Sequence, residues 1–459
     1  MKFIGRKSEL DRLTKLYSKD EFGAALIYGR RRIGKSELIK ESIKKSKMKS
    51  LYYVCSETQE RTNVDALSSI VSKTFNLPKM SFSNAVELLE FIFEKSNTES
   101  FVFVLDEYPY LRNKVEGLDS ILQSLIDRYK DTSKMKFILC GSFVEVMKSL
   151  LEKNNPLYGR FNASLNLKQM DYYESSLFYP SFSNEDKVKL YSVFGGIPYY
   201  NREIDPNMTV EENIINLIAA PSARFIDEVD NYLKTEISKI ENANEVLDAL
   251  SRGFSRFKDI QDQSYVSSGP TLIDILKKLI NMDVVVKEAS INDENNTKKA
   301  GYYISDNMSR FYFRYINRYR SYMNVLDSKF FFKEFIKEDF ESQFVPKRFE
   351  EICKQYLIEM NKAGKINPPF FKIGKYYYNL PKEHKNGEFD VVTEDKNGYI
   401  FYEAKFTSKP VNKTQIDEEI TQIESTGLNA YRYGFISKNG FTKIDNKEYI
   451  LITLDDLYY

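Results

Sequence analysis

The chain has few of the side chains on which many catalytic sites depend. Its 459 residues include one histidine, His384, no tryptophan, and three cysteines, Cys55, Cys140 and Cys353. Zinc sites built on histidine, two-histidine metal hydrolases and serine–histidine–aspartate triads are therefore not expected. The cysteines lie far apart and form no CxxC pair, so we expect them to be small buried hydrophobic side chains. Any catalysis must depend on carboxylates, lysines, hydroxyls and bound metal.

The sequence also lacks long hydrophobic runs and an excess of charge of one sign. Its longest apolar runs, such as residues 101–105, have the length of a strand and are too short to cross a bilayer. The first ten residues contain no apolar stretch long enough for a signal peptide. We therefore expect a cytoplasmic protein that does not contact a membrane. The net charge is +1, so any contact with DNA must be local.

The length predicts two to four domains, and the pattern of the sequence separates four regions. Residues 1–165 alternate short apolar strands with helical stretches, which is typical of an α/β parallel sheet. Residues 166–230 are expected to be mostly helical, residues 231–325 to form three helices and a β-hairpin, and residues 326–459 to end in strands. The clearest strands are Ala24–Tyr28, Leu51–Cys55, Phe101–Leu105, Phe137–Cys140, Phe389–Val392, Tyr399–Phe406 and Tyr433–Ile436.

A phosphate-binding loop follows the first of these strands. Residues 29–36, GRRRIGKS, fit the pattern GxxxxGK[ST], with a strand before them and a helical stretch after them. Gly29 and Gly34 permit a tight turn whose backbone N–H groups surround the β-phosphate of ATP. Lys35 is expected to neutralise the β- and γ-phosphate oxygens, and the Ser36 hydroxyl to bind Mg²⁺. The nucleotide contacts predicted here are Gly29, Arg30, Arg31, Arg32, Ile33, Gly34, Lys35, Ser36 and Glu37.

Two carboxylates end the apolar strand at residues 101–105. Their burial is costly unless they meet a cation or solvent. Asp106 is placed to hold Mg²⁺ through water, and Glu107 is placed to polarise the attacking water. Hydrolysis of ATP is therefore favoured over phosphoryl transfer, and a small-molecule kinase is the weaker alternative.

Two further side chains are candidates for the same site. Ser142 follows the strand at residues 137–140 and is expected to sense the γ-phosphate. Arg160 is expected to supply charge to the transition state, as an arginine finger does, although an arginine in a loop is often only a surface ion-pair partner. If Arg160 acts in a neighbouring subunit, the protein forms a homo-oligomer; if it acts in its own chain, a monomer suffices.

Several motifs together resemble the archaeal and bacterial ATPases related to the AAA+ and STAND groups. They are FIGRKSEL at 3–10, the P-loop with its arginines, LDE at 105–107, CGS at 140–142, PLYGR at 156–160 and GGIP at 195–198. The resemblance covers roughly the first 330 residues. It implies a P-loop core with an additional strand, Gly5 and Arg6 near the adenine, a helical lid over residues 166–230 and a winged helix over residues 231–325.

The third region contains a pattern that is typical of DNA-binding domains. Residues 257–260 and 272–279 place apolar side chains at helical spacing, and a turn at 267–270 separates them. A helix-turn-helix can lay its second helix in the major groove and present Lys277 and Lys278 to phosphates. The alternative is a lid or a protein-interaction module.

The last region holds a second group of carboxylates. Asn-Gly at 397–398 between two apolar runs predicts a hairpin. If Thr393 pairs near Ile400, Asp390 lies opposite Glu403 with Cβ atoms roughly 5 Å apart. Two carboxylates so placed destabilise the sheet unless a positive group lies between them.

Lys405 lies two residues after Glu403 and therefore points to the same face of its strand. Together with Asp390, these groups can bind Mg²⁺ or Mn²⁺ and orient a water for attack on a phosphodiester. The alternative is a solvated strand face without chemistry.

FD at 389–390 and EAK at 403–405, after the helical stretch at 349–357, resemble the PD-(D/E)XK nuclease-like domain that accompanies this ATPase family. This resemblance covers about the last 110 residues. It implies a C-terminal α/β restriction-endonuclease-like domain over residues 326–459, in which Glu350 is the metal-binding helix carboxylate and Glu351 its rival. The proline in the motif PD-(D/E)XK is replaced by Phe389 in this sequence.

The leading hypothesis is an α/β ATPase that couples ATP to DNA binding or to metal-dependent DNA cleavage. The alternative is a nucleotide-driven switch whose C-terminal domain binds without cutting. ATP and Mg²⁺ are the expected cofactors and DNA is the expected partner, whereas in the alternative the winged helix binds a partner or an operator.

Overall fold

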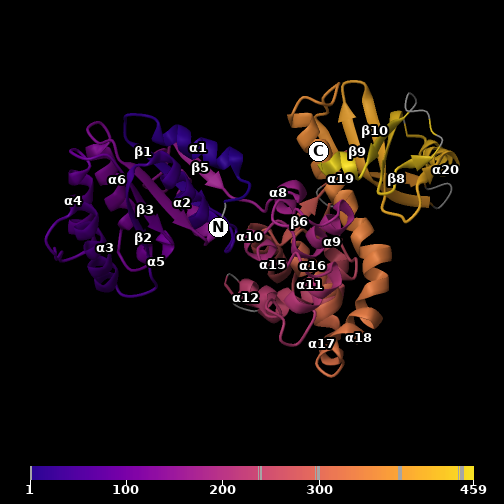
Figure 1. Ribbon diagram of the computed structural model, residues 1–459, viewed down its shortest axis with the longest axis horizontal. Coiled ribbons are helices and arrows are strands. Elements are labelled where there is room, and N and C mark those ends of the chain that lie inside the picture. Colours follow the sequence, from indigo (N-terminus) through magenta and orange to yellow (C-terminus); the bar gives the residue numbers. More distant parts are fainter. Residues whose placement is uncertain are drawn as a thin grey trace. The chain divides into compact units, whose positions relative to one another are not determined.

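The computed structural model describes residues 3–235, 237, 240–294, 296, 300–380, 385–428, 430–442, 444 and 449–458. His384 lies outside these residues. The chain divides into two compact units: the first comprises Met1–Gln169 and Ile197–Tyr199, and the second comprises Met170–Gly196 and Tyr200–Tyr459 (Figure 1). None of the helices in the described ranges is both long and apolar enough to cross a membrane.

A parallel five-stranded sheet with the order β2-β3-β4-β1-β5 forms the centre of the first unit (Figure 1). Its strands are β1 (Gly23–Tyr28), β2 (Lys49–Val54), β3 (Phe101–Asp106), β4 (Lys136–Gly141) and β5 (Ala163–Asn166). The four strands predicted for this region are confirmed within two residues at each end, and β5 was not predicted. Strand β4 lies between β1 and β3, so the sheet has the additional strand that the resemblance implies.

Seven helices accompany this sheet in the first unit. They are α1 (Lys7–Tyr17), α2 (Lys35–Ser46), α3 (Glu60–Phe75), α4 (Ala85–Lys95), α5 (Tyr108–Arg112), α6 (Leu118–Tyr129) and α7 (Val144–Ser149). Strands β1, β3 and β4 are buried along their whole length, as expected for a parallel sheet covered on both faces. All strand pairs are parallel, so the residues that follow β1, β3 and β4 lie at the same edge of the sheet.

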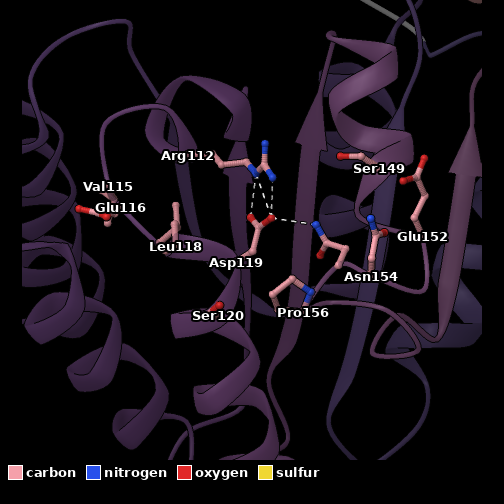
Figure 2. Close-up of a pocket in the computed structure, with 12 residues that line it drawn as sticks. Arg112, Val115, Glu116, Leu118, Asp119, Ser120, Ser149, Glu152, Asn154 and Pro156 are labelled. Carbon is pink, nitrogen blue, oxygen red and sulfur yellow. Dashed lines mark hydrogen bonds and ion pairs between the residues drawn. The ribbon is translucent and has the colours of Figure 1, made fainter.

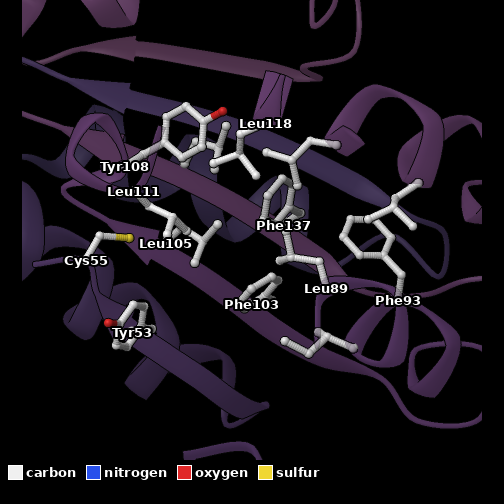
Figure 3. Packing of buried hydrophobic residues seen from close by; sticks show 14 of the residues in the cluster. Tyr53, Cys55, Leu89, Phe93, Phe103, Leu105, Tyr108, Leu111, Leu118 and Phe137 are labelled. Atoms are coloured by element: carbon white, nitrogen blue, oxygen red, sulfur yellow. The ribbon is translucent and has the colours of Figure 1, made fainter. Parts of the chain in front are cut away.

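Aromatic rings fill the core beside this sheet (Figure 3). Phe103 and Phe137 stack with their centroids 5.3 Å apart, and Phe93 meets Phe137 edge to face at 5.7 Å. Cys55 and Cys140 are buried free thiols, as is Cys353 in the second unit. The prediction that the cysteines are buried and unpaired is therefore confirmed.

The second unit begins with helices and a hairpin. The helices are α8 (Tyr172–Ser176), α9 (Asn184–Phe194), α10 (Pro198–Asn201, shared with the first unit), α11 (Val210–Leu217), α12 (Glu228–Leu233), α13 (Ile240–Ser251), α14 (Phe257–Ser264) and α15 (Gly269–Asn281). Strands β6 (Val285–Glu288) and β7 (Gly301–Ile304) then pair antiparallel. The three helices and the hairpin predicted for residues 231–325 are present, but helical segments over residues 307–323 follow the hairpin and were not predicted.

A further helical stretch leads to the C-terminal sheet. It consists of α16 (Asn307–Phe311), α17 (Arg318–Met323), α18 (Ser328–Phe332), α19 (Val345–Lys362) and the π-helical segments η1 (Tyr312–Asn317), η2 (Lys333–Lys337) and η3 (Phe340–Phe344). The π-helical segments join neighbouring helices without a loop.

A mixed five-stranded sheet with the order β14-β12-β10-β9-β8 ends the chain (Figure 1). Its strands are β8 (Lys372–Leu380), β9 (Lys385–Asp395), β10 (Gly398–Lys405), β12 (Ala430–Ser437) and β14 (Ile450–Thr453), and they are accompanied by α20 (Lys413–Ser425), η5 (Asp455–Tyr458), β11 (Val411–Asn412) and β13 (Phe441–Thr442). Thr393 pairs with Ile400, so the predicted hairpin register is confirmed. Strands β8 and β14 were not predicted.

Candidate functional site

The loop between β1 and α2 carries the predicted phosphate contacts. Gly29 and Gly34 have φ angles of 151° and 94°, and a Cβ on Gly29 would lie 2.4 Å from the backbone oxygen of Leu167. Only glycine fits this close approach. Lys35 is buried, and its Nζ donates to the carbonyl oxygens of Gly29 at 2.9 Å and Arg30 at 3.0 Å. The ammonium group is therefore held at the loop itself.

A hydroxyl and a carboxylate meet beside this loop. Ser36 Oγ donates to Asp106 Oδ2 at 2.7 Å, and the Tyr52 hydroxyl donates to the same oxygen at 2.5 Å. Asp106 is only 2% exposed. Burial, and after it the charge of Asp106, raises the pKa of Tyr52, so the tyrosine remains a proton donor. A serine hydroxyl and a carboxylate are the oxygen ligands that suit Mg²⁺, and these residues therefore fit that ion.

Tyr52 was not predicted as part of the site. It lies on β2, whose last residue, Val54, pairs with Asp106. Because side chains two residues apart on a strand share a face, Tyr52 lies on the same face of the sheet as Asp106. The sequence of β2 alone does not predict this role, because it depends on the pairing of β2 with β3.

Glu107 follows Asp106 in a left-handed backbone conformation, with φ 52°. Its Oε2 accepts hydrogen bonds from Ser142 N at 3.1 Å and Ser142 Oγ at 2.8 Å. The structure therefore brings the predicted base and the predicted sensor into direct contact. Its Oε1 accepts no hydrogen bond within the described part of the chain.

Arg6 lies against the phosphate-binding loop. It is 4% exposed, and its Nη2 donates to the carbonyl oxygens of Ile33 at 3.3 Å and Lys168 at 2.5 Å. Its Nη1 forms an ion pair with Glu9 at 3.1 Å. Arg6 thus joins the beginning of the chain, where Gly5 has φ 67°, to the loop.

The remaining side chains of the loop point to several different partners. Arg31 Nη2 donates to the Tyr110 hydroxyl at 2.8 Å, and the Arg32 guanidinium lies 4.4 Å from the centre of the Tyr199 ring. Arg30 and Ile33 are buried, whereas Glu37 forms an exposed pair with Lys40. Residues near the GGIP motif are therefore part of the surroundings of the loop.

Arg160 lies at the opposite edge of the sheet. Its Nη2 pairs with Asp127 at 2.6 Å, and its Nη1 donates to the Pro156 carbonyl at 2.8 Å. It borders a cavity together with Glu21 and Phe22, which precede β1. The length of β1 separates this edge from the loop by about 17 Å. Arg160 therefore does not reach the loop of its own chain, and its role in catalysis stays a prediction.

A cavity of about 500 Å³ lies beside α6 in the first unit (Figure 2). On its wall Asp119 accepts hydrogen bonds from Arg112 at 2.8 Å, Tyr108 at 2.6 Å and Asn155 at 2.9 Å. Burial raises the pKa of Asp119, but these hydrogen bonds, that from Arg112 first, outweigh it and hold the pKa below its usual value. None of the predicted nucleotide contacts lines this cavity. Its polar groups instead tie α5 to the segment before β5.

Comparison with known families identifies the first part of the chain. A family model described as an ATPase domain predominantly from Archaea matches residues 3–204. We refer to residues 3–204 as the ATPase domain because they match this model, which covers less than half of the chain. The loop and carboxylates described above lie within the matched residues, and the match supports ATP hydrolysis. A second model, of archaeal and bacterial proteins of unknown function, matches residues 312–418.

Relatives and solved structures are similar to the chain over different lengths. An uncharacterised protein of Methanocaldococcus jannaschii is 27% identical over 467 residues, which covers 99% of each chain. An uncharacterised ATP-binding protein of the same organism is 36% identical over 53 residues, or 12% of this chain and 90% of that protein. A Walker-type ATPase of Pyrococcus abyssi has a TM-score of 0.50 at 18% identity and covers 68% of this chain and 96% of its own. This last likeness shows a shared fold.

Outside the ATPase domain, a basic groove of about 920 Å³ lies beside α15. The described residues that line it include four cations and no carboxylate: Arg256, Lys258, Lys277 and Lys287, with Phe257, Ile273, Leu276, Ile280, Ala300, Tyr302 and Tyr377. Lys278 instead pairs with Asp274 at 3.0 Å. Of the two lysines predicted to meet phosphates, only Lys277 lines the groove.

The predicted carboxylates of the C-terminal sheet lie close together. Asp390 Oδ2 pairs with Lys347 at 2.8 Å and its Oδ1 with Lys375 at 3.3 Å. Lys347 also pairs with Glu350 at 2.9 Å, so one ammonium group bridges the two acids. Burial raises the pKa of Asp390, but Lys347 and Lys375 outweigh it, and the pKa is lowered.

Glu403 pairs with Lys405 at 2.8 Å, which confirms that the two share a face of β10. Burial raises the pKa of Glu403. Lys405 also pairs with Glu419 at 2.6 Å. The rival of Glu350, Glu351, lies 3.8 Å from Lys354. Within the described ranges, no group of three or more acidic, histidine or cysteine side chains is arranged to hold a metal ion, and the metal site stays a prediction.

Glu350 gives this cluster a dependence on pH. Burial, followed by the charge of Asp390, raises the pKa of Glu350 to about 7 from an ordinary value of 4.5. The folded protein thus keeps a proton that the unfolded chain releases, so the free energy of unfolding falls as the pH rises between these values. Glu350→Gln cannot ionise. We expect the variant to be more stable than wild type by about 1–3 kcal/mol near pH 8 and equal to it near pH 4 in urea denaturation.

Glu359→Gln is the matched control, because Glu359 is exposed on the same helix and pairs with Lys362. It should follow the wild type at both pH values. If the free energy of unfolding falls by the same amount between pH 4 and pH 8 in wild type and in Glu350→Gln, Glu350 is ionised in the folded protein and the prediction is wrong.

Proposed function

We propose that the chain couples ATP hydrolysis in its ATPase domain to DNA binding in the basic groove. The observation that carries this proposal is the groove itself, whose described lining holds four cations and no carboxylate. Phosphate contacts supply most of the affinity of a protein for DNA, and they need cations without competing acids. The helices and the hairpin around the groove would form the winged helix that the sequence predicts.

In the ATPase domain, the loop of Gly29–Ser36 would hold the phosphates of ATP through its backbone N–H groups. When ATP binds, the hydrogen bonds from Lys35 to the carbonyl oxygens of Gly29 and Arg30 would be replaced by contacts with phosphate oxygens. Ser36 and Asp106 would hold Mg²⁺, which neutralises phosphate charge when it is bound. Tyr52 keeps one oxygen of Asp106 in place through its hydrogen bond.

Glu107 would act as the general base for water. Ser142 fixes Oε2 of the carboxylate, and Oε1 is left to accept a hydrogen bond from the water that attacks. A base positioned in this way contributes about 10²–10⁴-fold to a rate. If the hydrogen bonds from Ser142 to Oε2 broke, the Glu107 carboxylate would be able to turn toward the γ-phosphate.

Glu107→Gln tests this assignment. The amide cannot accept the proton, so we expect phosphate release from ATP to slow by about 10²–10⁴-fold, while nucleotide affinity is retained. Lys35→Ala should lose both affinity and turnover. The two quantities are measured by phosphate release and by binding of a labelled nucleotide.

Glu116→Gln is the control, because Glu116 is an exposed glutamate in the segment between α5 and α6. Its turnover should equal that of wild type. Turnover of Glu107→Gln within about twofold of wild type would exclude Glu107 as the base.

The groove is tested with a neighbouring pair of lysines. Lys277 lines the groove, whereas Lys278 is engaged by Asp274. We expect Lys277→Ala to weaken binding of duplex DNA and to reduce the slope of log affinity against log salt by about 1. Lys278→Ala should change both quantities less. Anisotropy of labelled duplex at several salt concentrations measures them, and equal effects of the two substitutions would contradict a role of the groove.

A second candidate function is metal-dependent DNA cleavage by the C-terminal sheet. The observation that favours it is the hairpin register, whose last pair is Tyr402 and Val391. The next residues on the two strands are Glu403 and Asp390, and Lys405 pairs with Glu403. Asp390 and Glu403 would hold Mg²⁺ or Mn²⁺, whose chemistry is the activation of water. Glu350 would add a third oxygen ligand from α19.

Cleavage of plasmid and single-stranded DNA with Mg²⁺ or Mn²⁺, with and without ATP, tests this candidate. We expect cleavage by wild type, its loss in Asp390→Ala, and no loss in Glu394→Ala, which changes another acid of β9. If wild type cleaves no form of DNA under any nucleotide condition, the C-terminal domain is a binding module, and the chain is a nucleotide-driven switch.

A further inference from the structure

The C-terminal sheet carries a pocket that none of the sites above uses. Its volume is about 490 Å³, and it lies between the C-terminal half of α19 and strands β10, β12 and β14. Tyr356 and Met360 line it from the helix, and Tyr402 and Arg432 line it from the sheet. Pockets of roughly 300–1,000 Å³ are typical sites for small ligands.

The floor of the pocket is shaped by a glycine. A Cβ on Gly434 would lie 2.3 Å from Cδ1 of Tyr402, so the Tyr402 ring lies over the backbone of β12. Ile400 pairs with Arg432 across the two strands, which places the guanidinium beside this apolar and aromatic floor. Tyr402 is only 6% exposed, whereas Tyr431, which also lines the pocket, is 40% exposed. Tyr431 therefore offers an accessible ring, and Arg432 beside it in sequence offers a cation.

The described lining of the pocket carries two positive groups, Lys365 and Arg432, and one negative group, Asp456. Neither Arg432 nor Lys365 makes a hydrogen bond or an ion pair through its side chain with any other described residue, and both are exposed. Asp456 is the carboxylate among the described lining residues, but its Oδ2 already accepts hydrogen bonds from the backbone N and the Oγ of Thr453, each at 2.7 Å. Two cations beside an aromatic ring suit an anion that carries a flat ring.

We propose that this pocket binds a nucleotide, with its base on the Tyr431 side and its phosphate at Arg432 and Lys365. Stacking on tyrosine and charge-assisted contacts to phosphate are the two means by which proteins hold single nucleotides. The same chemistry is offered by a free mononucleotide and by the terminal nucleotide of a strand.

This site is independent of ATP hydrolysis, since no residue of the ATPase domain lines the pocket. Its test uses the absence of tryptophan from the chain. Met360→Trp introduces a single indole into the pocket, in a chain that also carries Lys35→Ala to remove nucleotide binding at the P-loop. Deoxynucleoside 5′-monophosphates, the corresponding nucleosides and a short 5′-phosphorylated oligonucleotide are titrated while the indole fluorescence is recorded.

We expect a saturable change of fluorescence with the monophosphates and a much weaker response to the nucleosides. Arg432→Gln should raise the dissociation constant by about tenfold or more, as expected for the loss of one charge-assisted contact, and Lys365→Gln should act in the same direction. Lys362→Gln, which changes an exposed lysine at the end of α19 that pairs with Glu359, should leave the dissociation constant unchanged. Tighter binding of the oligonucleotide identifies a strand end, and equal binding identifies a free nucleotide.

The absence of a saturable change with every nucleotide and oligonucleotide would overturn the proposal. An unchanged dissociation constant in both Arg432→Gln and Lys365→Gln would do the same. Thermal melting shows whether each variant is folded. If one of Arg432→Gln and Lys365→Gln does not fold, the other is sufficient for the test. ATP turnover of the otherwise unaltered chain is measured in parallel, so a failure of the pocket is distinguished from a failure of the ATPase assignment.

Discussion

The nucleotide site depends on a buried carboxylate at the end of a parallel strand. Asp106 is almost inaccessible to water, and a carboxylate in such a place is costly without donors around it. It obtains them from Ser36 on α2, from Tyr52 on β2 and from the backbone N–H of Glu107. One side chain therefore fixes the beginning of a helix, the face of a neighbouring strand and the residue that follows.

Features defined by a short stretch of sequence were predicted well. Two such features are the glycines and the lysine of residues 29–36 and the apolar strand that ends in two acids. They can be predicted from the sequence because their backbone geometry and their burial are local properties. Strand β5 was missed because Ala163–Asn166, ASLN, is short and weakly apolar. Strand β8 was missed because its sequence, KIGKYYYNL, does not alternate apolar and polar residues.

Features that depend on distant partners could not be predicted. The two lysines of α15 are an exception: Asp274 lies four residues before Lys278, the spacing of an ion pair on a helix, and this local signal was not used. The positive groups that stabilise Asp390 come from α19 and β8, about 43 and 15 residues away in the sequence. The alternation of β9 and β10 predicts that two acids face each other, but it does not say whether lysine or metal compensates them.

The path of the chain between its two units has a consequence for any attempt to isolate the ATPase domain. Residues Ile197–Tyr199 belong to the first unit although the 27 residues before them belong to the second, and Tyr199 lies under the Arg32 guanidinium. A fragment that ends at Gln169 retains every strand of the parallel sheet but lacks this returning segment. All residues of the parallel sheet and of the phosphate-binding loop therefore precede Met170, but the contact of the loop with Tyr199 also requires the later segment Ile197–Tyr199.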